Sequence, residues 1–222
     1  MKVKLIAHTH DPDALAGAAA RSCRSQRATD KILKEDRSKL LRSLEICVKH
    51  GHDSVIEHAS FTFSVEDVSR ACTHELVRHR IASYSQQSQR AVKLEKKYVV
   101  PPTIFKDKVA EKAYVDAMDA SWKEYADLIN RGIPVEDARY VLPNAATANI
   151  LVTMNARSLM NFFKLRCCNH AQWEIRELAY EMLKLVKKVA PAIFAKAGPA
   201  CVIDGACPEN DESCPLYPKK PR

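Results

Sequence analysis

The stretch ATANILVTMNARSLMNFFKLRCCNHAQWEIRELAYEMLKLVKKVA, residues 146–190, decides the fold class of this chain. Residues 146–154 alternate between apolar and mostly polar side chains, which predicts a β-strand. Residues 158–168 and 172–190 then carry apolar side chains at helical spacing, which predicts two consecutive helices. A strand followed by two helices lacks the regular βαβ rhythm of a parallel sheet and indicates an α+β fold.

The remaining segments mix strands and helices in the same irregular way. Gly51 lies at a position that commonly ends a helix, and Pro134 lies where a helix commonly begins. At 222 residues, the chain is long enough for one sizeable core. We therefore predict a single α+β domain with a central mixed or antiparallel sheet and several long helices. The other predicted strands are 2–7 and 61–65, and the other predicted helices are 13–23, 34–50, 68–80, 106–130 and a short helix between 134 and 143.

The charge of the chain favours an anionic partner. Thirty-five basic and 27 acidic residues give a net charge of +8, which suits nucleotides, nucleic acid or an acidic membrane. A nucleic-acid-binding module is the weaker alternative, because aromatic residues make up only 7% and the Lys-rich pieces 93–97 and 184–188 alternate with apolar residues. No apolar run reaches the roughly 18 residues of a membrane span. We expect a cytoplasmic protein that binds neither membrane nor nucleic acid.

Three of the eight cysteines, Cys201, Cys207 and Cys214, lie in a loop-like C-terminal segment. They could hold a metal, but they lack the C-x-x-C pairs of zinc modules and a clear fourth ligand. Because we expect a cytoplasmic protein, free thiols are the commoner state for these cysteines. The expectation is that the chain has no metal site.

Residues 78–90, RHRIASYSQQSQR, collect three arginines, a histidine, serines and amides without one carboxylate. Arginine presents a planar fork that matches phosphate oxygens, and hydroxyl groups can complete the cradle. A solvated loop is the alternative interpretation. Because the glycine-rich phosphate loops GxxxxGK[ST] and GxGxxG are absent, we do not expect a conventional nucleotide-binding fold. The stretch predicts a site for a phosphorylated ligand.

A second polar cluster, Asn155, Arg157, Asn161, Arg166 and His170, follows the strand of residues 146–154. Amides beside arginines suit a heterocyclic base or a flavin ring, whose edges present both donors and acceptors. Helix capping and exposed charge are the alternative interpretation.

Arg78-His79-Arg80 followed by Ser88 and Arg90 resembles the signature of the flavin-dependent thymidylate synthases. Supporting blocks occur in order along nearly the whole chain: IEHASFTF (56–63), EDARYVLP (136–143), and NARSLMNFF with HAQWEIRE from residue 155 onward. The resemblance implies an α+β catalytic domain over residues 1–200, a Cys- and Pro-containing tail over 201–222, and a homotetramer with FAD held between subunits. It implies reductive methylation at C5 of a uridine monophosphate, dUMP by family default. The implied co-substrates are methylenetetrahydrofolate and NADPH.

The resemblance also assigns residues to this chemistry. Arg166 would act as the catalytic cation that stabilises charge on the uracil ring. The FAD-contacting residues would be His58, Ser60, Arg78, His79, Arg80, Gln86, Asn155, Ala156, Arg157, Asn161 and His170. The nucleotide-contacting residues would be Glu75, Arg78, Gln86, Gln87, Ser88, Gln89, Arg90, Arg139 and Arg166.

Two positions depart from the usual family pattern beside the nucleotide. Glu75 stands where a glutamine is usual, and Ala91 stands where a tyrosine is usual. A carboxylate accepts a hydrogen bond from a sugar hydroxyl, and the smaller alanine opens space. The ribonucleotide UMP is therefore an alternative substrate to dUMP.

Overall fold

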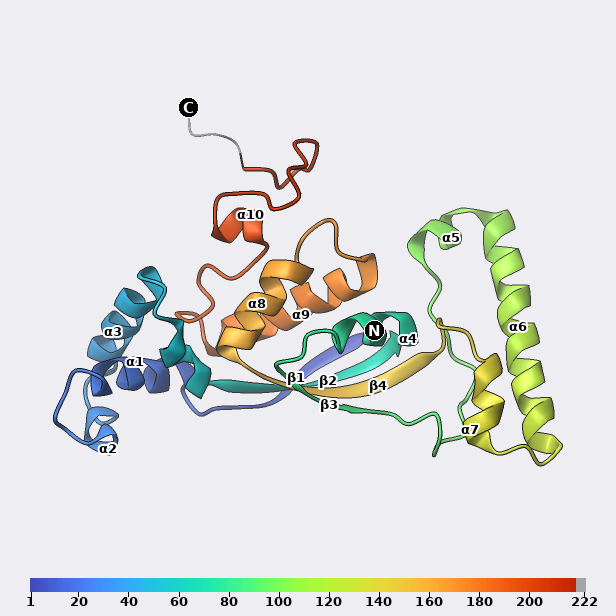
Figure 1. Ribbon diagram of the computed structural model, residues 1–222, viewed down its shortest axis with the longest axis horizontal. Helices are drawn as coiled ribbons and strands as arrows, with labels where there is room; N and C mark the ends of the chain where they lie inside the picture. Colours follow the sequence, from blue (N-terminus) through green and yellow to red (C-terminus); the bar gives the residue numbers. More distant parts are fainter. Residues whose placement is uncertain (219–222) are drawn as a thin grey trace. The chain divides into compact units, whose positions relative to one another are not determined.

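The computed structural model describes residues 1–218, and the fold is α+β as predicted (Figure 1). The strands β1 (Lys2–His8), β2 (Ser60–Ser69), β3 (Ser83–Gln86) and β4 (Thr147–Asn155) form one sheet in the order β1-β2-β4-β3. Strands β2 and β4 run antiparallel, because Thr62 bonds to Thr153 and Asp67 bonds to Asn149. The helices are α1 (Pro12–Ser22), α2 (Thr29–Ile32), α3 (Arg37–Lys49), η1 (Asp53–His58), α4 (Arg70–Leu76), α5 (Pro102–Lys106), α6 (Lys108–Asn130), α7 (Val135–Ala138), η2 (Arg139–Val141), α8 (Ala156–Arg166), α9 (Trp173–Val189) and α10 (Ala200–Ile203).

The region after β2 differs from the sequence expectation. A helix was predicted over 68–80, but α4 begins at Arg70, after Ser69 caps it by accepting from the Cys72 N–H, and ends at Leu76. The polar stretch that follows is not only loop, because β3 forms within it and the Gln87 N–H continues the pairing to the Asn149 carbonyl. Tertiary contacts therefore override the helical periodicity beyond residue 76.

The chain divides into two compact units, and strands β2 and β4 continue through both. The first unit contains residues 1–2, 65–78 and 84–151. The second unit contains residues 3–64, 79–83 and the chain from Val152 onward.

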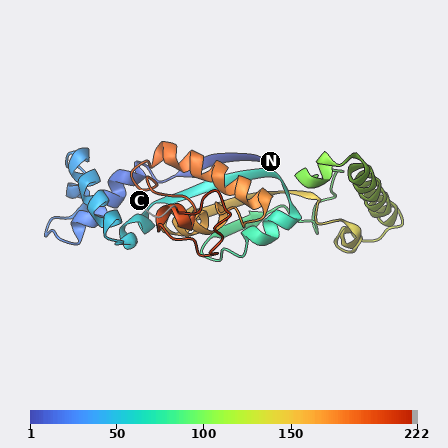
Figure 2. The same ribbon diagram turned by 90° about the horizontal axis from the view of Figure 1, so that it is seen from above.

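In the second unit, α8 and α9 lie on one face of the sheet (Figures 1 and 2). Phe61 of β2, Phe163 of α8 and Phe194 after α9 are fully buried, and their rings meet edge to face at 5.4 and 5.9 Å between centroids. Aromatic pairs in this geometry contribute beyond their buried area. This cluster fixes α8, which carries much of the second polar cluster, against the sheet.

Helices α1 and α3 of the second unit pack unusually closely, because α1 has Gly17 at the contact. A Cβ atom at position 17 would lie 2.3 Å from the carbonyl oxygen of Leu40 on α3. Only glycine is compatible with this approach of the two backbones.

The first unit is built around α6, which covers the segment before α5. Tyr98 packs edge to face against Tyr114 and Trp122 of α6, and the Tyr114 hydroxyl donates to the Val99 carbonyl at 2.7 Å. Tyr98 also forms an antiparallel bridge with Ala146. The extended segment around residue 98 is thus held between α6 and the start of β4. Among the described residues, no helix has both the length and the apolarity needed to cross a bilayer.

Candidate functional site

A cavity of about 840 Å³ in the second unit gathers residues from four separate parts of the chain. Four predicted FAD-contacting residues line it: His79, Asn155, Arg157 and Asn161. The segment 48–57, the segment 196–204 and Ser158 supply other parts of the lining. We call this the coenzyme cavity. Its size is within the range of small-molecule and cofactor sites.

His79 is held in one tautomer by a hydrogen-bond chain. The Ser158 hydroxyl donates to the Ile81 carbonyl, so its oxygen must accept at 2.7 Å from His79 Nε2, which therefore carries a proton. The ring also packs edge to face on Phe162 at 5.6 Å. Burial, followed by the nearby positive charge of Arg166, lowers the pKa of His79 below its usual value. His79 is thus a neutral, oriented donor at the cavity wall.

Asn155 and Arg157 are positioned by the start of α8. The Asn155 side chain caps the helix by accepting from the Ser158 N–H at 2.9 Å, and the Ala156 N–H donates to the Ala59 carbonyl at 2.8 Å. Arg157 forms an ion pair with Glu57 of η1. These contacts set the backbone at the point where β4 turns into α8.

The cavity contains more cations than the sequence analysis assigned to it. Lys164 pairs with Asp204 at 2.5 Å. Lys49 and Lys196 also line the cavity, and neither has an acidic partner among the described residues. Two unpaired ammonium groups beside neutral donors fit the two negative charges of a dinucleotide pyrophosphate. The residue types present are therefore compatible with FAD.

Not every predicted FAD-contacting residue lines this cavity. His58 at the end of η1 and Arg80 are exposed, and Ser60 begins β2 with its N–H donating to the Thr9 hydroxyl at 2.9 Å. His170 forms an ion pair with Asp211 at 2.9 Å and lines a different, smaller cavity. Ala156 is buried behind the wall, at the start of α8.

The predicted nucleotide-contacting residues of the first unit lie at the end of α4, at the end of β3, in the segment after β3 and in η2. The Gln86 amide donates to the Thr73 hydroxyl of α4 at 2.9 Å, and the Gln87 side-chain oxygen accepts from the Asn149 N–H at 3.3 Å. Arg90 pairs with Glu136 at 3.2 Å, next to Arg139 of η2. Arg78, Ser88 and Arg90 are exposed, whereas Glu75 and Gln89 are half-buried.

Arg70 is a member of this neighbourhood that the sequence analysis missed. Its pKa is lowered, first by burial and then by the nearby charge of Arg139. Two guanidinium groups near enough to affect each other electrostatically favour the binding of an anion beside them. The only sequence signal was an arginine directly after the helix-capping Ser69.

Arg166, the predicted catalytic cation, is the last residue of α8 and is half-buried. It belongs to the second unit and lies close enough to His79 to lower its pKa. The predicted uracil-facing cation is therefore a neighbour of the coenzyme cavity.

The tail cysteines meet a fourth cysteine that the sequence did not indicate. Cys168, Cys201, Cys207 and Cys214 line one cavity of about 70 Å³. All eight cysteines of the chain are free, and within residues 1–218 no three His, Cys, Asp or Glu side chains are arranged to hold a metal ion. Burial, followed by Cys168 and Cys207, raises the pKa of Cys201, which lowers the fraction of the reactive thiolate.

Known proteins resemble this chain over nearly its full length. A family model described as "Thymidylate synthase complementing protein" matches residues 4–192. The flavin-dependent thymidylate synthase of Geobacter sulfurreducens is 50% identical and that of Clostridium tetani is 48% identical, each over 96% of this chain, and the matches cover 94% and 93% of those proteins. The crystal structure of a UMP/dUMP methylase from Streptomyces cacaoi, bound with 5-Br dUMP, has the same fold. Its TM-score is 0.78 at 24% identity, covering 87% of this chain and 93% of that one.

Proposed function

Because the chain belongs to the flavin-dependent thymidylate synthases and is a flavin-dependent methyltransferase, we propose that it converts dUMP to dTMP. In this proposal FAD is the coenzyme, methylenetetrahydrofolate is the carbon donor and NADPH is the reductant. FAD, when bound, supplies the hydride chemistry, and the protein supplies binding, orientation and electrostatics.

One observation carries the proposal: the coenzyme cavity collects His79, Asn155, Arg157 and Asn161 in its lining. Each was assigned to FAD on a resemblance in sequence, and His79 is separated from the other three by more than 70 positions of the chain. Their convergence on one cavity with unpaired Lys49 and Lys196 is what a ring system joined to a pyrophosphate requires.

The substrate side follows from charge. Arg70, Arg90 and Arg139 would bind the nucleotide phosphate, and Gln86 and Gln87 would be held in place by their bonds to Thr73 and Asn149. Arg166 would lie against the uracil edge as a fixed cation. In that place it would stabilise negative charge on the ring while C5 acts as the nucleophile.

We also propose a homotetramer in which each FAD lies between subunits. Arg80 and His58 are exposed and lie outside the lining of the coenzyme cavity of a single chain. Both side chains are therefore available to a coenzyme bound mainly by another subunit. Light scattering of the flavin-loaded protein should give four chains per particle, and a monomer with full flavin occupancy would contradict the shared site.

UMP remains the second candidate substrate. Glu75 is half-buried on α4 and Ala91 is exposed, so a carboxylate acceptor and open space occur where the family usually has an amide and an aromatic ring. A site that hydrogen-bonds a hydroxyl rejects the substrate that lacks it. Parallel titrations with dUMP and UMP decide: binding and turnover of dUMP with none of UMP would exclude the ribonucleotide.

The proposed function is tested with the purified protein. It should be yellow, with flavin absorbance, and should transfer a labelled methylene group from the folate to a uridylate in the presence of NADPH. A colourless protein that takes up no added FAD and converts neither uridylate would overturn the proposal.

A further inference from the structure

The second unit contains another cavity, of about 490 Å³, between the C-terminal halves of α1 and α3. Its polar lining consists of Arg21, Arg24, Ser25, Ser43, His50 and His52, and no aspartate or glutamate lines it. We call it the α1–α3 cavity. It shares no lining residue with the coenzyme cavity, although residues 46–53 contribute to both.

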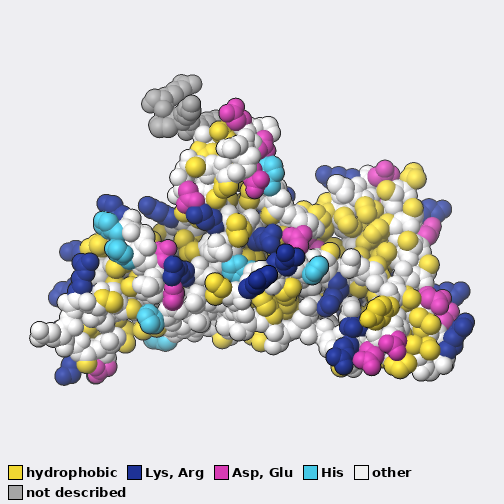
Figure 3. Space-filling view, viewed as in Figure 1, with side chains coloured by type: hydrophobic (Ala, Val, Ile, Leu, Met, Phe, Trp, Pro, Cys, Tyr) yellow, Lys and Arg dark blue, Asp and Glu magenta, His cyan; other side chains and the backbone are white. Residues whose placement is uncertain are grey.

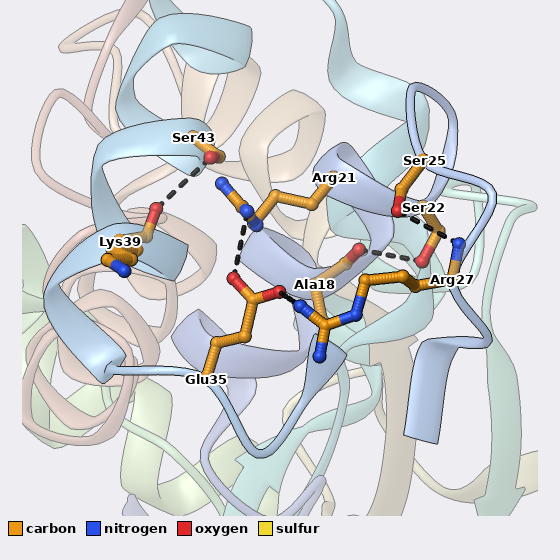
Figure 4. Close-up of polar contacts among 8 residues, drawn as sticks. All are labelled: Ala18, Arg21, Ser22, Ser25, Arg27, Glu35, Lys39 and Ser43. Carbon is orange, nitrogen blue, oxygen red and sulfur yellow. Dashed lines mark hydrogen bonds and ion pairs between the residues drawn. The ribbon is translucent and has the colours of Figure 1, made fainter. Parts of the chain in front are cut away.

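The charge around the α1–α3 cavity is not balanced by the protein. Glu35 is shared between Arg21 and Arg27, at 2.8 and 2.7 Å, so one carboxylate faces two guanidinium groups (Figure 4). Arg24 has no acidic partner among the described residues. Lys, Arg and His side chains gather on the surface over α3 (Figure 3). An excess of positive charge remains for a ligand to offset.

Arg21 also has an unsatisfied donor. Its Nε atom is buried and has no hydrogen-bond partner, and its side chain extends toward Ser43 of α3 (Figure 4). Buried donors in native proteins nearly always have an acceptor, because leaving one unpaired is costly. Because this Nε atom is buried, an acceptor that enters the cavity reaches it only if the Arg21 side chain shifts.

Two imidazole rings complete the lining. His50 and His52 stack with 6.3 Å between centroids, and His50 Nδ1 bonds to the Ile46 carbonyl at 2.8 Å. Because a carbonyl only accepts, Nδ1 carries the proton, and in the neutral ring Nε2 is an acceptor that offers no donor to an anion. The donors that the cavity offers to an oxyanion are therefore the guanidinium groups of Arg21 and Arg24 and the hydroxyl of Ser25.

We propose that the α1–α3 cavity binds an oxyanion group, phosphate or carboxylate, of one of the two co-substrates. This inference rests on the proposed function, because the folate donor carries glutamate carboxylates and the nicotinamide reductant carries phosphates. Residues of the segment 46–53 line both cavities, so a ligand in the α1–α3 cavity lies close to the coenzyme cavity. This position favours a co-substrate of the same reaction over an effector that acts from a distance. A molecule anchored there by one end lies next to the cavity in which FAD is expected.

Arg24→Gln is the variant that tests this inference, because Arg24 lines the cavity without a partner whose loss would unfold the region. Arg42→Gln, on the exposed side of α3, removes the same charge away from the cavity and is the matched control. Arg21→Lys is the second variant, since it keeps a charge beside Glu35 but removes the Nε donor and the fork.

Calorimetric titration of the flavin-loaded protein compares ligands that differ only in the oxyanion. NADPH and NADH differ in the 2′-phosphate, and tetrahydrofolate and tetrahydropteroate differ in the glutamate. The unmodified protein should prefer the oxyanion-bearing member of one pair by about tenfold or more. Arg24→Gln and Arg21→Lys should abolish that preference, and Arg42→Gln should keep it. The affected pair identifies the co-substrate.

Two results would overturn the inference while leaving the proposed function intact. One is an active protein in which Arg24→Gln changes neither preference. The other is an equal loss of FAD affinity in Arg24→Gln, which would make the cavity part of the coenzyme site. If the unmodified protein takes up no flavin, the proposed function fails. Titration with inorganic phosphate then tests the oxyanion site independently of the proposed function. Equal phosphate affinity in Arg24→Gln and in the unmodified protein would exclude an oxyanion site in the α1–α3 cavity.

Discussion

The coenzyme cavity and the α1–α3 cavity belong to the same unit but differ in how much of their positive charge is paired within the protein. In the coenzyme cavity, Arg157 and Lys164 are paired with Glu57 and Asp204, so the lining contains both signs. In the α1–α3 cavity no acid lines the space, and the Glu35 carboxylate that pairs with Arg21 is shared with Arg27. Internally paired charges orient a wall without demanding a ligand, whereas unpaired ones demand an anion. Among residues 1–218, the coenzyme cavity therefore combines two paired cations with the unpaired Lys49 and Lys196, whereas the α1–α3 cavity has no acid in its lining.

The largest expected effect is on the rate of methyl transfer and concerns Arg166, which lies near the coenzyme cavity but does not line it. Arg166→Ala should lower methyl transfer by about 10²–10³-fold, because it removes fixed positive charge from the uracil ring. Its FAD content, measured by absorbance, should remain unchanged. Arg131→Ala, an exposed arginine after α6, is the control. Unchanged transfer would remove the role assigned to Arg166.

The unpaired lysines of the coenzyme cavity give the next largest effect. The double variant Lys49→Gln/Lys196→Gln should weaken FAD binding by about 10–100-fold, since two charge-assisted contacts to phosphate are lost. Flavin fluorescence titration measures the change. Arg24→Gln should leave this affinity as it is, which keeps the two cavities distinct. A double variant that binds FAD normally would mean that neither lysine contacts the pyrophosphate.

The His79 hydrogen-bond chain should contribute to stability as well as to orientation. Ser158→Ala removes the acceptor of His79 Nε2 and the donor to Ile81. It should lower the free energy of unfolding by about 1–3 kcal/mol, because a buried donor and a carbonyl lose their partner. Urea denaturation measures this. Ser43→Ala, in the α1–α3 cavity, should cost less, since the Ser43 hydroxyl only donates within its own helix. Equal losses would contradict the special role of the chain at His79.

The smallest effect concerns pH. His79 has a lowered pKa in the folded protein, so below its ordinary value of 6.5 the unfolded chain takes up a proton that the folded chain resists. Stability contributed by this group is therefore present above pH 6.5 and is lost as the pH falls through that value toward the folded pKa. The free energy of unfolding of His79→Gln should fall less steeply between pH 7 and 5 than that of the unmodified protein. Parallel slopes would show that other groups determine the pH dependence.

Sequence reasoning found the α+β class and most long elements because their periodicity is strong. The predicted strand 146–154 became β4 (Thr147–Asn155), and the predicted helix 172–190 became α9 (Trp173–Val189). It extended α4 too far, because apolar spacing continues to Val77 while His79 turns inward to Ser158. It also missed η1 and α2, which are too short to show a period.

The candidate site shows a similar division. His79, Asn155, Arg157 and Asn161 were assigned from motifs, and the structure brings these four to one cavity. Glu57 and Lys196 could not be assigned, because their place depends on distant segments meeting: Glu57 pairs with Arg157, which is 100 residues away. Arg21 and Arg24 could not be assigned to a binding site from the sequence either, because arginines near the end of a helix are ordinarily solvated.

The missing side chain at position 17 has a consequence for ligand capture. Because α1 touches the backbone of α3 at Leu40, the distance between the two helices is determined by their main chains and not by adaptable rotamers. A methyl group at position 17 would push α1 away from α3, and it would thereby increase the separation of Arg21 on α1 from Ser43 on α3. Gly17 thus determines the width of the α1–α3 cavity, although it does not line the cavity and would not contact a ligand there.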